Sequence, residues 1–470
     1  MPRIQSIEFK KHQVFGTTAF DFCDASGKPA QTITFAGRNG SGKTRLLEEL
    51  YHGTKQEYTI DAPVRRQRRT VITIDMTDSC FYDYNYPDIT IDSVKLITSS
   101  DSDSTEVFYH VTFFHGDKEV KHVGEKNTIN EVTTFTLNSA YSGTDINYIP
   151  RVPVKNVTNL DLDAGELYES DDVAHDVTQL LIDVASQDND DIALRVHQRP
   201  HLSVPKSIRE NLRMMRFSRA FIYMFGDKLK YKTIRDNIKP IFEKDGKEVP
   251  IESLSSGEKQ IVFRGVYLLR NIRNLTGCPV FIDEPELSMH PTWAQKIYGY
   301  YKSLFLDHDG RQTSQIFIAT HNEYVVKSAI EDESSIILDI CIDCNKYRKL
   351  SKDMAGEILP KITLAEIKHL VFGVYSPDFH IQLYAYIQNE LAKAAAMRGI
   401  DDYLLHYKAP KKKSSYMSGR RLVTYHSLPT YIRNAIDHPD DTLVFSEDEL
   451  AQSIEWMIDF IKQRREESEA

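Results

Sequence analysis

The chain has 470 residues, of which 41% are hydrophobic and 27% charged, with 21 Gly, 18 Pro and a formal net charge of -10. This composition excludes collagenous, low-complexity and wholly disordered proteins, and the length fits one large domain with an insertion or an appended region. The acidic balance argues against a general coating of nucleic acid and permits only local basic grooves. The sequence shows neither an apolar run of about 18 residues nor an apolar signal core near Met1, so we expect a cytoplasmic protein without a membrane segment.

The N-terminal region predicts strands, a glycine-rich loop and a helix in direct succession. Residues 4–9 alternate as in an edge strand, and a second strand over residues 32–35 leads into the sequence GRNGSGKT of residues 37–44. Helical spacing follows in residues 45–51. This order is typical of a phosphate-binding loop, because glycines let successive backbone N–H groups turn inward at the start of a helix.

We expect this loop to bind ATP together with Mg²⁺. Lys43 can reach the β- and γ-phosphates, and the Thr44 hydroxyl is a hard oxygen donor suited to Mg²⁺. The other residues expected at the nucleotide are Gly37, Asn39, Gly40, Ser41 and Gly42. The alternative is a glycine-rich turn that holds no ligand.

A compact α+β insertion is expected over about residues 55–230, with β-like runs at residues 70–74 and 107–114. It contains a basic run at residues 64–69 and an amphipathic helix with two stripes. The basic stripe consists of Lys206, Arg209, Arg213 and Arg216, and the apolar stripe of Ile208, Leu212, Met215 and Ile222. The basic stripe is a candidate contact for nucleic-acid phosphates, although a solvated face is the favoured interpretation because the protein is acidic overall.

Three further motifs follow in the second half of the chain. After a hairpin predicted at Asp245-Gly246, residues 254–260 (LSSGEKQ) begin an apolar helix. Residues 279–286 (PVFIDEPE) then place two carboxylates at the end of an apolar strand, and a last buried strand over residues 315–320 leads to His321.

The two carboxylates are candidates for catalysis, since ligands bind at the carboxyl ends of parallel strands. Asp283 is expected to hold Mg²⁺ through water, and Glu284 to orient or deprotonate the attacking water. A solvated acidic strand end is the alternative interpretation.

The four motifs in this order resemble those of ABC-class ATPases. The resemblance implies that residues 254–260 are the signature motif, that His321 is the switch histidine, and that two subunits sandwich two ATP molecules. Each signature helix would offer its N-terminus to the γ-phosphate bound by the opposite subunit, in a homodimer or a higher oligomer. The residues at that contact would be Ser255, Ser256, Gly257 and Glu258.

Within this class, the signature and the stretch DEPELSMHP at residues 283–291 resemble the RecF, SMC and OLD branch more than transporter subunits. No heptad repeat of a long coiled coil is seen. The chain is similar to stand-alone ATPases of bacterial anti-phage systems, including the PtuA-like ATPase of Septu systems. The resemblance implies an ABC-type ATPase domain over residues 1–345 that acts as a switch on a partner nuclease. A RecF-like DNA-repair ATPase is an alternative.

Residues 346–470 are expected to form an appended all-α domain, with helical patterns at residues 379–388 and 447–461 and a lysine-rich loop at residues 408–413. The absence of strand-helix alternation supports this expectation.

Arg433, Asn434 and His438 resemble the Arg-polar-x-x-x-His motif of HEPN ribonucleases. The resemblance implies an ATP-gated ribonuclease that is its own effector, with His438 handling a proton and Arg433 stabilising the phosphate. The favoured alternative is that His438 closes a helix before Pro439. Five residues at about 100° each would place Arg433 and His438 on different faces of that helix.

The five Cys, at positions 23, 80, 278, 341 and 344, fit reduced thiols rather than a disulfide framework. Cys341 and Cys344 have the spacing of a metal-binding pair, but no second pair accompanies them.

Overall fold

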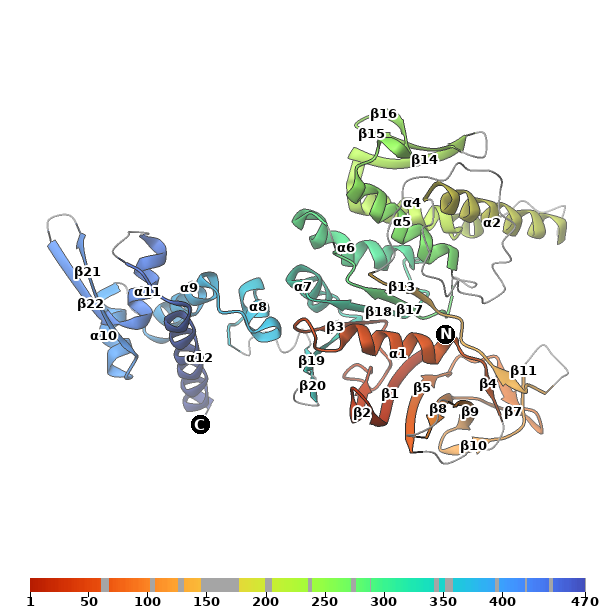
Figure 1. Ribbon diagram of the computed structural model, residues 1–470, viewed down its shortest axis with the longest axis horizontal. Helices are drawn as coiled ribbons and strands as arrows, with labels where there is room; N and C mark the ends of the chain where they lie inside the picture. The colour runs from red at the N-terminus through yellow and green to blue at the C-terminus, as the bar shows by residue number, and fades with distance from the viewer. Residues whose placement is uncertain are drawn as a thin grey trace. The chain divides into compact units, whose positions relative to one another are not determined.

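The computed structural model describes residues 1–60, 67–101, 106–125, 131–144, 177–198, 205–235, 239–271, 276–287, 289–341, 346–350, 358–393, 397–418, 421–438 and 443–469. The chain forms two compact units, Met1–Leu350 and Ser351–Ala470 (Figure 1). The first half of the basic run, residues 64–66, and Cys344 of the Cys341-Cys344 pair lie outside the described residues. None of the helices in the described part of the chain combines the length and hydropathy that a membrane crossing requires.

The N-terminal sheet of the first unit has eight strands in the order β12-β4-β9-β8-β5-β1-β2, with β10 paired to β9. These strands are β1 (Arg3–His12), β2 (Gly16–Asp21), β4 (Tyr58–Thr59), β5 (Arg68–Asp75), β8 (Ser93–Ser100), β9 (Val107–His115), β10 (Lys118–Val120) and β12 (Thr134–Phe135). Strand β1 pairs with β2 on one side and β5 on the other, so the prediction of an edge strand is wrong. Alternating burial shows that a strand has one buried face, but it does not show whether the strand pairs with one or two other strands.

The central sheet has six strands in the order β13-β17-β18-β3-β19-β20. They are β3 (Thr32–Ala36), β13 (Ala140–Ser142), β17 (Val280–Asp283), β18 (Ile316–Thr320), β19 (Ser335–Cys341) and β20 (Lys346–Leu350). All pair in parallel except β19 with β20. Strands β3 and β18 are buried throughout, as expected for parallel strands covered on both faces. The carboxyl ends of β3, β17 and β18 therefore meet at one edge.

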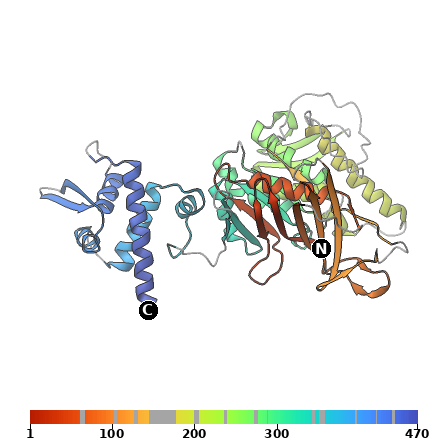
Figure 2. The same ribbon diagram turned by 60° about the horizontal axis from the view of Figure 1, so that its bottom comes forward.

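Helix α1 (Lys43–Lys55) packs between the two large sheets (Figures 1 and 2). Leu46 and Leu50 share a hydrophobic core with Phe281 and Phe317 of the central sheet and with Leu96 of the N-terminal sheet. The opposite face of the central sheet is covered by α5 (Ser256–Asn271), α6 (Pro291–Leu304) and α7 (Glu323–Glu331) (Figure 1).

The remaining elements of the first unit form two smaller groups. One is the three-stranded sheet of β6 (Phe81–Asp83), β7 (Tyr86–Thr90) and β11 (Val123–Glu125). The other combines α2 (Val177–Gln198), α3 (Lys206–Glu210) and α4 (Arg213–Phe225) with the sheet of β14 (Leu229–Arg235), β15 (Lys239–Lys244) and β16 (Lys247–Pro250). Asp245 and Gly246 have φ of 50° and 76° between β15 and β16, so the predicted hairpin is confirmed. The predicted α/β class with a mixed sheet is also confirmed.

The second unit has its own hydrophobic core, formed by residues such as Phe379, Ile432 and Met457. Its helices are α8 (Leu364–Phe372), α9 (Pro377–Tyr386), α10 (Met397–His406), α11 (Leu428–Asp437) and α12 (Glu447–Glu469), and a π-helical turn at Ile387–Leu391 extends α9. Strands β21 (Lys411–Ser418) and β22 (Arg421–Ser427) form an antiparallel hairpin. The all-α prediction is therefore wrong here, because antiparallel pairing satisfies backbone N–H and C=O groups even where the side chains are charged.

Candidate nucleotide site

The glycine-rich loop connects the end of β3 to the start of α1 in a conformation that requires glycine. Gly37, Gly40 and Gly42 have φ of 143°, 78° and 84°. A Cβ on Gly37 would lie 2.8 Å from the Ile340 carbonyl oxygen and 2.9 Å from the Ser41 Oγ. Positive φ and this close approach explain why the sequence places glycine at these positions. Asn39 is exposed in the same loop.

Lys43 is buried at the first turn of α1, and its Nζ donates hydrogen bonds to the carbonyl oxygens of Gly37 and Arg38, each at 3.0 Å. Burial lowers the pKa of Lys43, while the charges of Glu284, Asp283 and Glu286 act in the opposite direction. The ammonium group is thus held inside the loop, next to the acidic edge of the central sheet.

Thr44 and Asp283 meet across the neighbouring ends of α1 and β17. The Thr44 hydroxyl donates to Asp283 Oδ1 at 3.2 Å, and burial raises the pKa of Asp283. Asp283 Oδ2 is buried without a hydrogen-bond partner among the described residues. A hydroxyl and a carboxylate oxygen with unused acceptor capacity are the donors that Mg²⁺ prefers, so these residues fit the expected ion.

Glu284 and His321 also come together, from the ends of β17 and β18. Glu284 has a φ of 44°, which is unusual for a residue with a side chain, and its carboxylate contacts His321 Nδ1. Burial raises the pKa of Glu284. The structure therefore gathers Lys43, Thr44, Asp283, Glu284 and His321 at one edge of the sheet.

Glu286 belongs to the same cluster and was not expected from the sequence. Its Oε1 accepts a hydrogen bond from Thr320 Oγ1 at 2.5 Å and lies 3.9 Å from His321 Nδ1. Burial, together with the charge of Glu284, raises the pKa of Glu286 to about 7. The only sign of its role in the sequence is its position after Pro285 in the PVFIDEPE stretch. That position does not show whether the side chain turns toward the cluster.

The signature residues begin α5 and contact the β15-β16 hairpin and α6. Ser255 and Glu258 form a capping box, in which the Ser255 backbone N–H donates to Glu258 Oε2 at 2.7 Å and the Glu258 N–H to Ser255 Oγ at 3.3 Å. Lys244 Nζ also donates to both Glu258 carboxylate oxygens at 2.9 Å. Burial acts to raise the pKa of Glu258, but these hydrogen bonds hold that pKa below its ordinary value.

The other signature positions differ in how accessible they are. Ser255 and Ser256 are exposed at the start of α5. A Cβ on Gly257 would lie 2.7 Å from the Trp293 ring, so only glycine fits beneath it. Glu258 therefore shapes the start of the helix, while the two serines remain open to a ligand.

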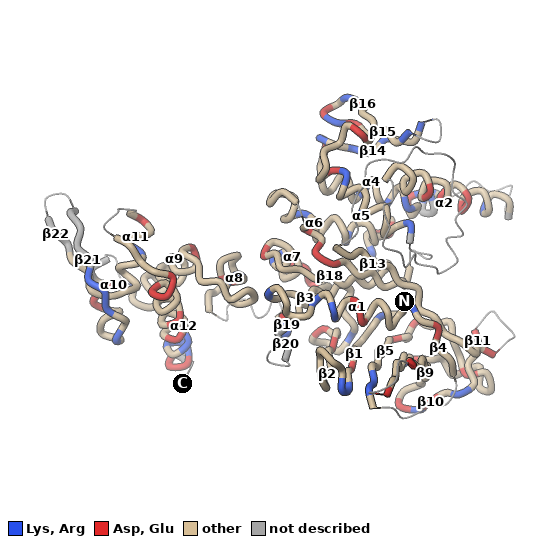
Figure 3. The backbone as a smooth tube through the Cα atoms, in the orientation of Figure 1, with Lys and Arg blue, Asp and Glu red and all other residues tan. Residues whose placement is uncertain are grey.

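Two members of the predicted basic stripe, Arg213 and Arg216, are not exposed, so both the favoured solvated face and the nucleic-acid contact are wrong for them. Helices α3 and α4 are separate, and Arg213 and Arg216 of α4 are buried. Arg213 NH1 lies 2.9 Å from Asp191 Oδ2 of α2, and Arg216 NH1 donates to Thr313 Oγ1 at 2.9 Å. Figure 3 shows the acidic residues of α2 near the basic residues of α4.

The predicted apolar stripe of the same helix is correspondingly inverted. Met215 and Ile222 are each 43% exposed, whereas Phe217 and Phe221 are buried. Within α4, the sides expected for the basic and the apolar residues are therefore exchanged. Lys206 is exposed and lies 3.4 Å from Glu210, and Arg209 is also exposed.

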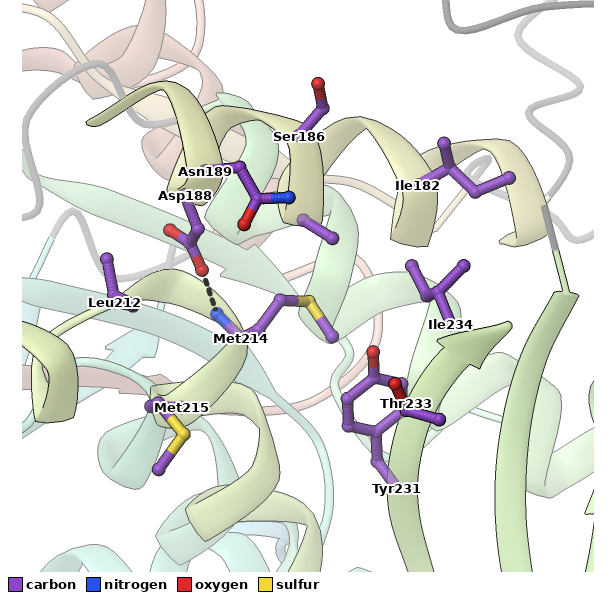
Figure 4. A pocket seen from close by; sticks show the side chains of 11 residues that line it. Ile182, Ser186, Asp188, Asn189, Leu212, Met214, Met215, Tyr231, Thr233 and Ile234 are labelled. Carbon is purple, nitrogen blue, oxygen red and sulfur yellow. Dashed lines mark hydrogen bonds between the residues drawn. The ribbon is translucent and has the colours of Figure 1, made fainter. Parts of the chain in front are cut away.

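A pocket of about 450 Å³ lies between α2, α4 and β14 (Figure 4). Ile182, Met214 and Ile234 supply apolar lining, and Asp188 accepts the backbone N–H groups of Arg213 and Met214 at 2.9 and 2.8 Å. These hydrogen bonds cap the start of α4, so the Asp188 carboxylate, the most polar group of the pocket, already has partners in the helix.

The candidate ribonuclease residues lie at the end of α11 in the second unit. Arg433 NH2 lies 2.5 Å from Asp437 Oδ2, Asn434 is buried, and the His438 N–H donates to the Asn434 carbonyl at 2.9 Å. His438 is the C-cap residue of the helix. This geometry is the one that the helix-closing interpretation describes.

Comparison with known proteins gives one family match. Residues 158–327 match the model of a family described as an AAA domain, putative AbiEii toxin, of a type IV toxin-antitoxin system. The matched segment includes residues 254–260 and 279–286 and His321 but begins after the glycine-rich loop. Comparison with curated proteins gives no significant match.

Among solved structures, the chain is similar to the Smc head domain with an extended coiled coil from Pyrococcus furiosus, solved with the C-terminal domain of ScpA. The identity is 14%, the match covers 76% of this chain and 98% of that chain, and the TM-score is 0.40. The SMC head domain from Thermotoga maritima matches at 11% identity over 74% of this chain and 98% of that chain, with a TM-score of 0.36.

Proposed function

We propose that the protein is an ABC-type ATPase that binds ATP with Mg²⁺, hydrolyses it, and uses it to join two copies of the chain. The observation that carries this proposal is the convergence of Lys43, the Thr44-Asp283 pair and the Glu284-His321 pair at the carboxyl ends of β3, β17 and β18. These side chains come from motifs up to hundreds of residues apart in the sequence, and together they provide the parts that phosphoryl transfer to water requires.

Each side chain has a distinct role in this proposal. Lys43 and the loop amides bind the phosphates, and Thr44 and Asp283 would hold Mg²⁺, which neutralises phosphate charge when bound. Glu284 orients the attacking water and accepts its proton, a role that its raised pKa favours because a stronger base is a better proton acceptor. His321 orients the Glu284 carboxylate through their direct contact.

Association of two copies would complete the site. Ser255, Ser256 and the Gly257 amide lie at the start of α5, a helix N-terminus that attracts phosphate. A second copy related by a two-fold axis would present the same groups to the γ-phosphate of the first. The Glu258 carboxylate would act indirectly, by holding Ser255 in the capping box.

The biological role that we propose is an ATP-dependent switch in bacterial phage defence, acting on a nuclease supplied by another chain. Its support is the resemblance of the four motifs to anti-phage ATPases and the match of residues 158–327 to a family described as a putative toxin. The buried arginines of α4 do not favour the DNA-repair alternative. The Asn434 burial and the His438 cap do not favour the ribonuclease alternative.

The test is the association state of a Glu284→Gln variant, which should bind ATP but hydrolyse it slowly. With Mg-ATP, light scattering should show dimers for Glu284→Gln and monomers for Glu284→Gln combined with Lys43→Ala. Glu331→Gln, which changes an exposed carboxylate of α7, is the matched control and should behave as the unaltered chain. Equal association of the single and double variants would overturn the proposal.

A further inference from the structure

Arg264, in the middle of α5, is one of the largest fully buried side chains of the protein, with 1% of its surface exposed. It interrupts an apolar run in which Ile261, Phe263 and Val266 are all buried. Burying a guanidinium group is costly unless its N–H donors are satisfied. An arginine at this position therefore calls for an explanation beyond packing.

The donors of Arg264 are satisfied by two neighbouring strands. Its Nε donates to Ser142 Oγ at 3.0 Å, and its NH2 donates to the carbonyl oxygens of Ser142 and Gly143, each at 3.2 Å. On the other strand, NH2 donates to the Asp283 carbonyl oxygen at 2.6 Å and NH1 to the Glu284 carbonyl oxygen at 2.8 Å. One side chain thus joins α5 to the ends of β13 and β17.

The contacts to Asp283 and Glu284 involve the backbone that directs the two carboxylates into the nucleotide site. Glu284 has a φ of 44°, a conformation that costs energy for a residue with a side chain and persists only where neighbouring groups hold it. The Asp283 carbonyl precedes the Glu284 nitrogen, and the Glu284 carbonyl follows its Cα. Arg264 donates hydrogen bonds to both carbonyls and so fixes the orientation of this segment. They therefore help to set the direction in which the Glu284 carboxylate leaves the strand.

The same helix carries the signature residues at its start. Ser256 and Arg264 are separated by about two turns, or roughly 12 Å along the helix axis. This segment packs tightly against α6, since Tyr300 OH donates to the Ile261 carbonyl at 2.9 Å and a Cβ on Gly265 would lie 2.0 Å from that hydroxyl oxygen. A displacement at the start of α5 would reach the Glu284 backbone through Arg264.

We infer that Arg264 is a positioning residue for ATP hydrolysis, which ties the signature helix to the backbone of Asp283 and Glu284 and so orients the Glu284 carboxylate. This inference rests on the proposed function. It predicts that Arg264 affects turnover more than ATP binding, because the phosphates are bound by Lys43 and the loop on α1.

The test compares Arg264→Met with Arg270→Met in the full chain. Arg270 is a buried arginine of the same helix, 6% exposed, whose Nε lies 3.4 Å from Asp183 of α2. Arg264→Met should lower kcat about 100-fold, as misplacement of a reacting group does, with KM within about threefold. Arg270→Met should change the melting temperature but keep kcat within about threefold of the unaltered chain.

A second measurement separates positioning from a general loss of structure. In a Glu284→Gln background, Arg264→Met should cause no further loss of turnover, because the group that Arg264 orients is already disabled. If Arg264→Met does not fold, Arg264→Lys takes its place. This variant keeps the charge with fewer hydrogen-bond donors, and its kcat should lie between that of the unaltered chain and the value expected for Arg264→Met. Any of three results would overturn the inference: losses of kcat that multiply in the double variant, an unchanged kcat in Arg264→Met, or an equal loss of kcat in Arg270→Met. A complete lack of ATP hydrolysis by the unaltered chain would instead overturn the proposed function itself.

Discussion

Each unit of the protein contains a cluster of buried polar groups, and the two clusters differ in how their members are hydrogen-bonded. In the first unit, Ser41 Oγ, Asp283 Oδ2 and Glu286 Oε2 are buried at the edge of the central sheet without hydrogen-bond partners in the described ranges. In the second unit, Asp401 accepts the backbone N–H groups of His426 and Ser427, each at 2.9 Å, and the Ser427 hydroxyl at 2.5 Å.

The network of the second unit continues from one side chain to the next. Ser427 Oγ is 2.8 Å from Thr430 Oγ1, which is 3.1 Å from the Tyr384 hydroxyl, so α9, α10 and α11 are joined. Buried polar groups are normally paired, and a continuous hydrogen-bonded network of this kind stabilises the fold. Groups left open at a sheet edge indicate a ligand instead. The difference supports the proposed ligand site in the first unit and a structural role for this network in the second.

The largest expected effect is on catalysis. Asp283→Asn should lower ATP turnover about 100- to 1,000-fold, since it removes the charge that would hold Mg²⁺, with little change in stability. Burial raises the pKa of Asp283, so the folded protein gains little from its charge. Steady-state hydrolysis and thermal melting of the same preparation would check this, and turnover within a few-fold of the unaltered chain would contradict the assignment.

Asp401→Ala should have the opposite signature. Loss of its three hydrogen bonds leaves buried donors unpaired, and the free energy of unfolding of the second unit should fall by about 3 kcal/mol. Urea denaturation would measure the fall. The exposed neighbour Asp402, changed to Ala, is the matched control and should lose less than about 0.5 kcal/mol. Equal losses would show that the network contributes little.

The stability of the second unit should also depend on pH through His380. Burial lowers the pKa of this histidine to about 3, and its Nε2 is 3.0 Å from Ser453 Oγ. A depressed pKa means that the contribution of neutral His380 is fully present above its unfolded pKa of about 6.5 and is lost as the pH falls toward 3. Between pH 6.5 and 5 we expect a loss of about 2 kcal/mol, which His380→Gln should not show. Parallel pH profiles of the two proteins would refute this prediction.

The smallest expected effect concerns the residues first interpreted as a basic stripe. Lys206→Ala should change the free energy of unfolding by less than about 0.5 kcal/mol, because its pair with Glu210 is exposed. Arg216→Met should cost about 2 kcal/mol, because it leaves the Asn211 carbonyl and Thr313 hydroxyl without a buried donor. Chemical denaturation of the two variants side by side would distinguish them, and a similar cost for both would contradict the buried geometry.

The conformation of the glycine-rich loop could be predicted from sequence because its determinants are local. A strand, glycines at positions 37, 40 and 42, and a helix follow one another within a short segment, and each residue type has one conformational reason to be there. The order of the later motifs then placed Asp283, Glu284 and His321 at the carboxyl ends of neighbouring strands.

The residues that sequence analysis missed or misassigned depend on distant partners. Arg264 is satisfied by strands that are remote in the chain, and a lone arginine in an apolar helix does not reveal them. Arg213 and Arg216 face the interior because Asp188, Asp191 and Thr313 receive them there. Periodicity predicts that a helix has two faces, but tertiary contacts decide which face is buried.

Calorimetric titration of Mg-ATP into the full chain and into Lys43→Ala tests directly whether this edge of the sheet binds the nucleotide. We expect the unaltered protein to bind one ATP per chain and the variant to bind at least about 100-fold more weakly, because the ammonium group that the loop holds inside it is gone. Equal affinity of the two proteins would contradict the assignment of the nucleotide to the edge formed by β3, β17 and β18.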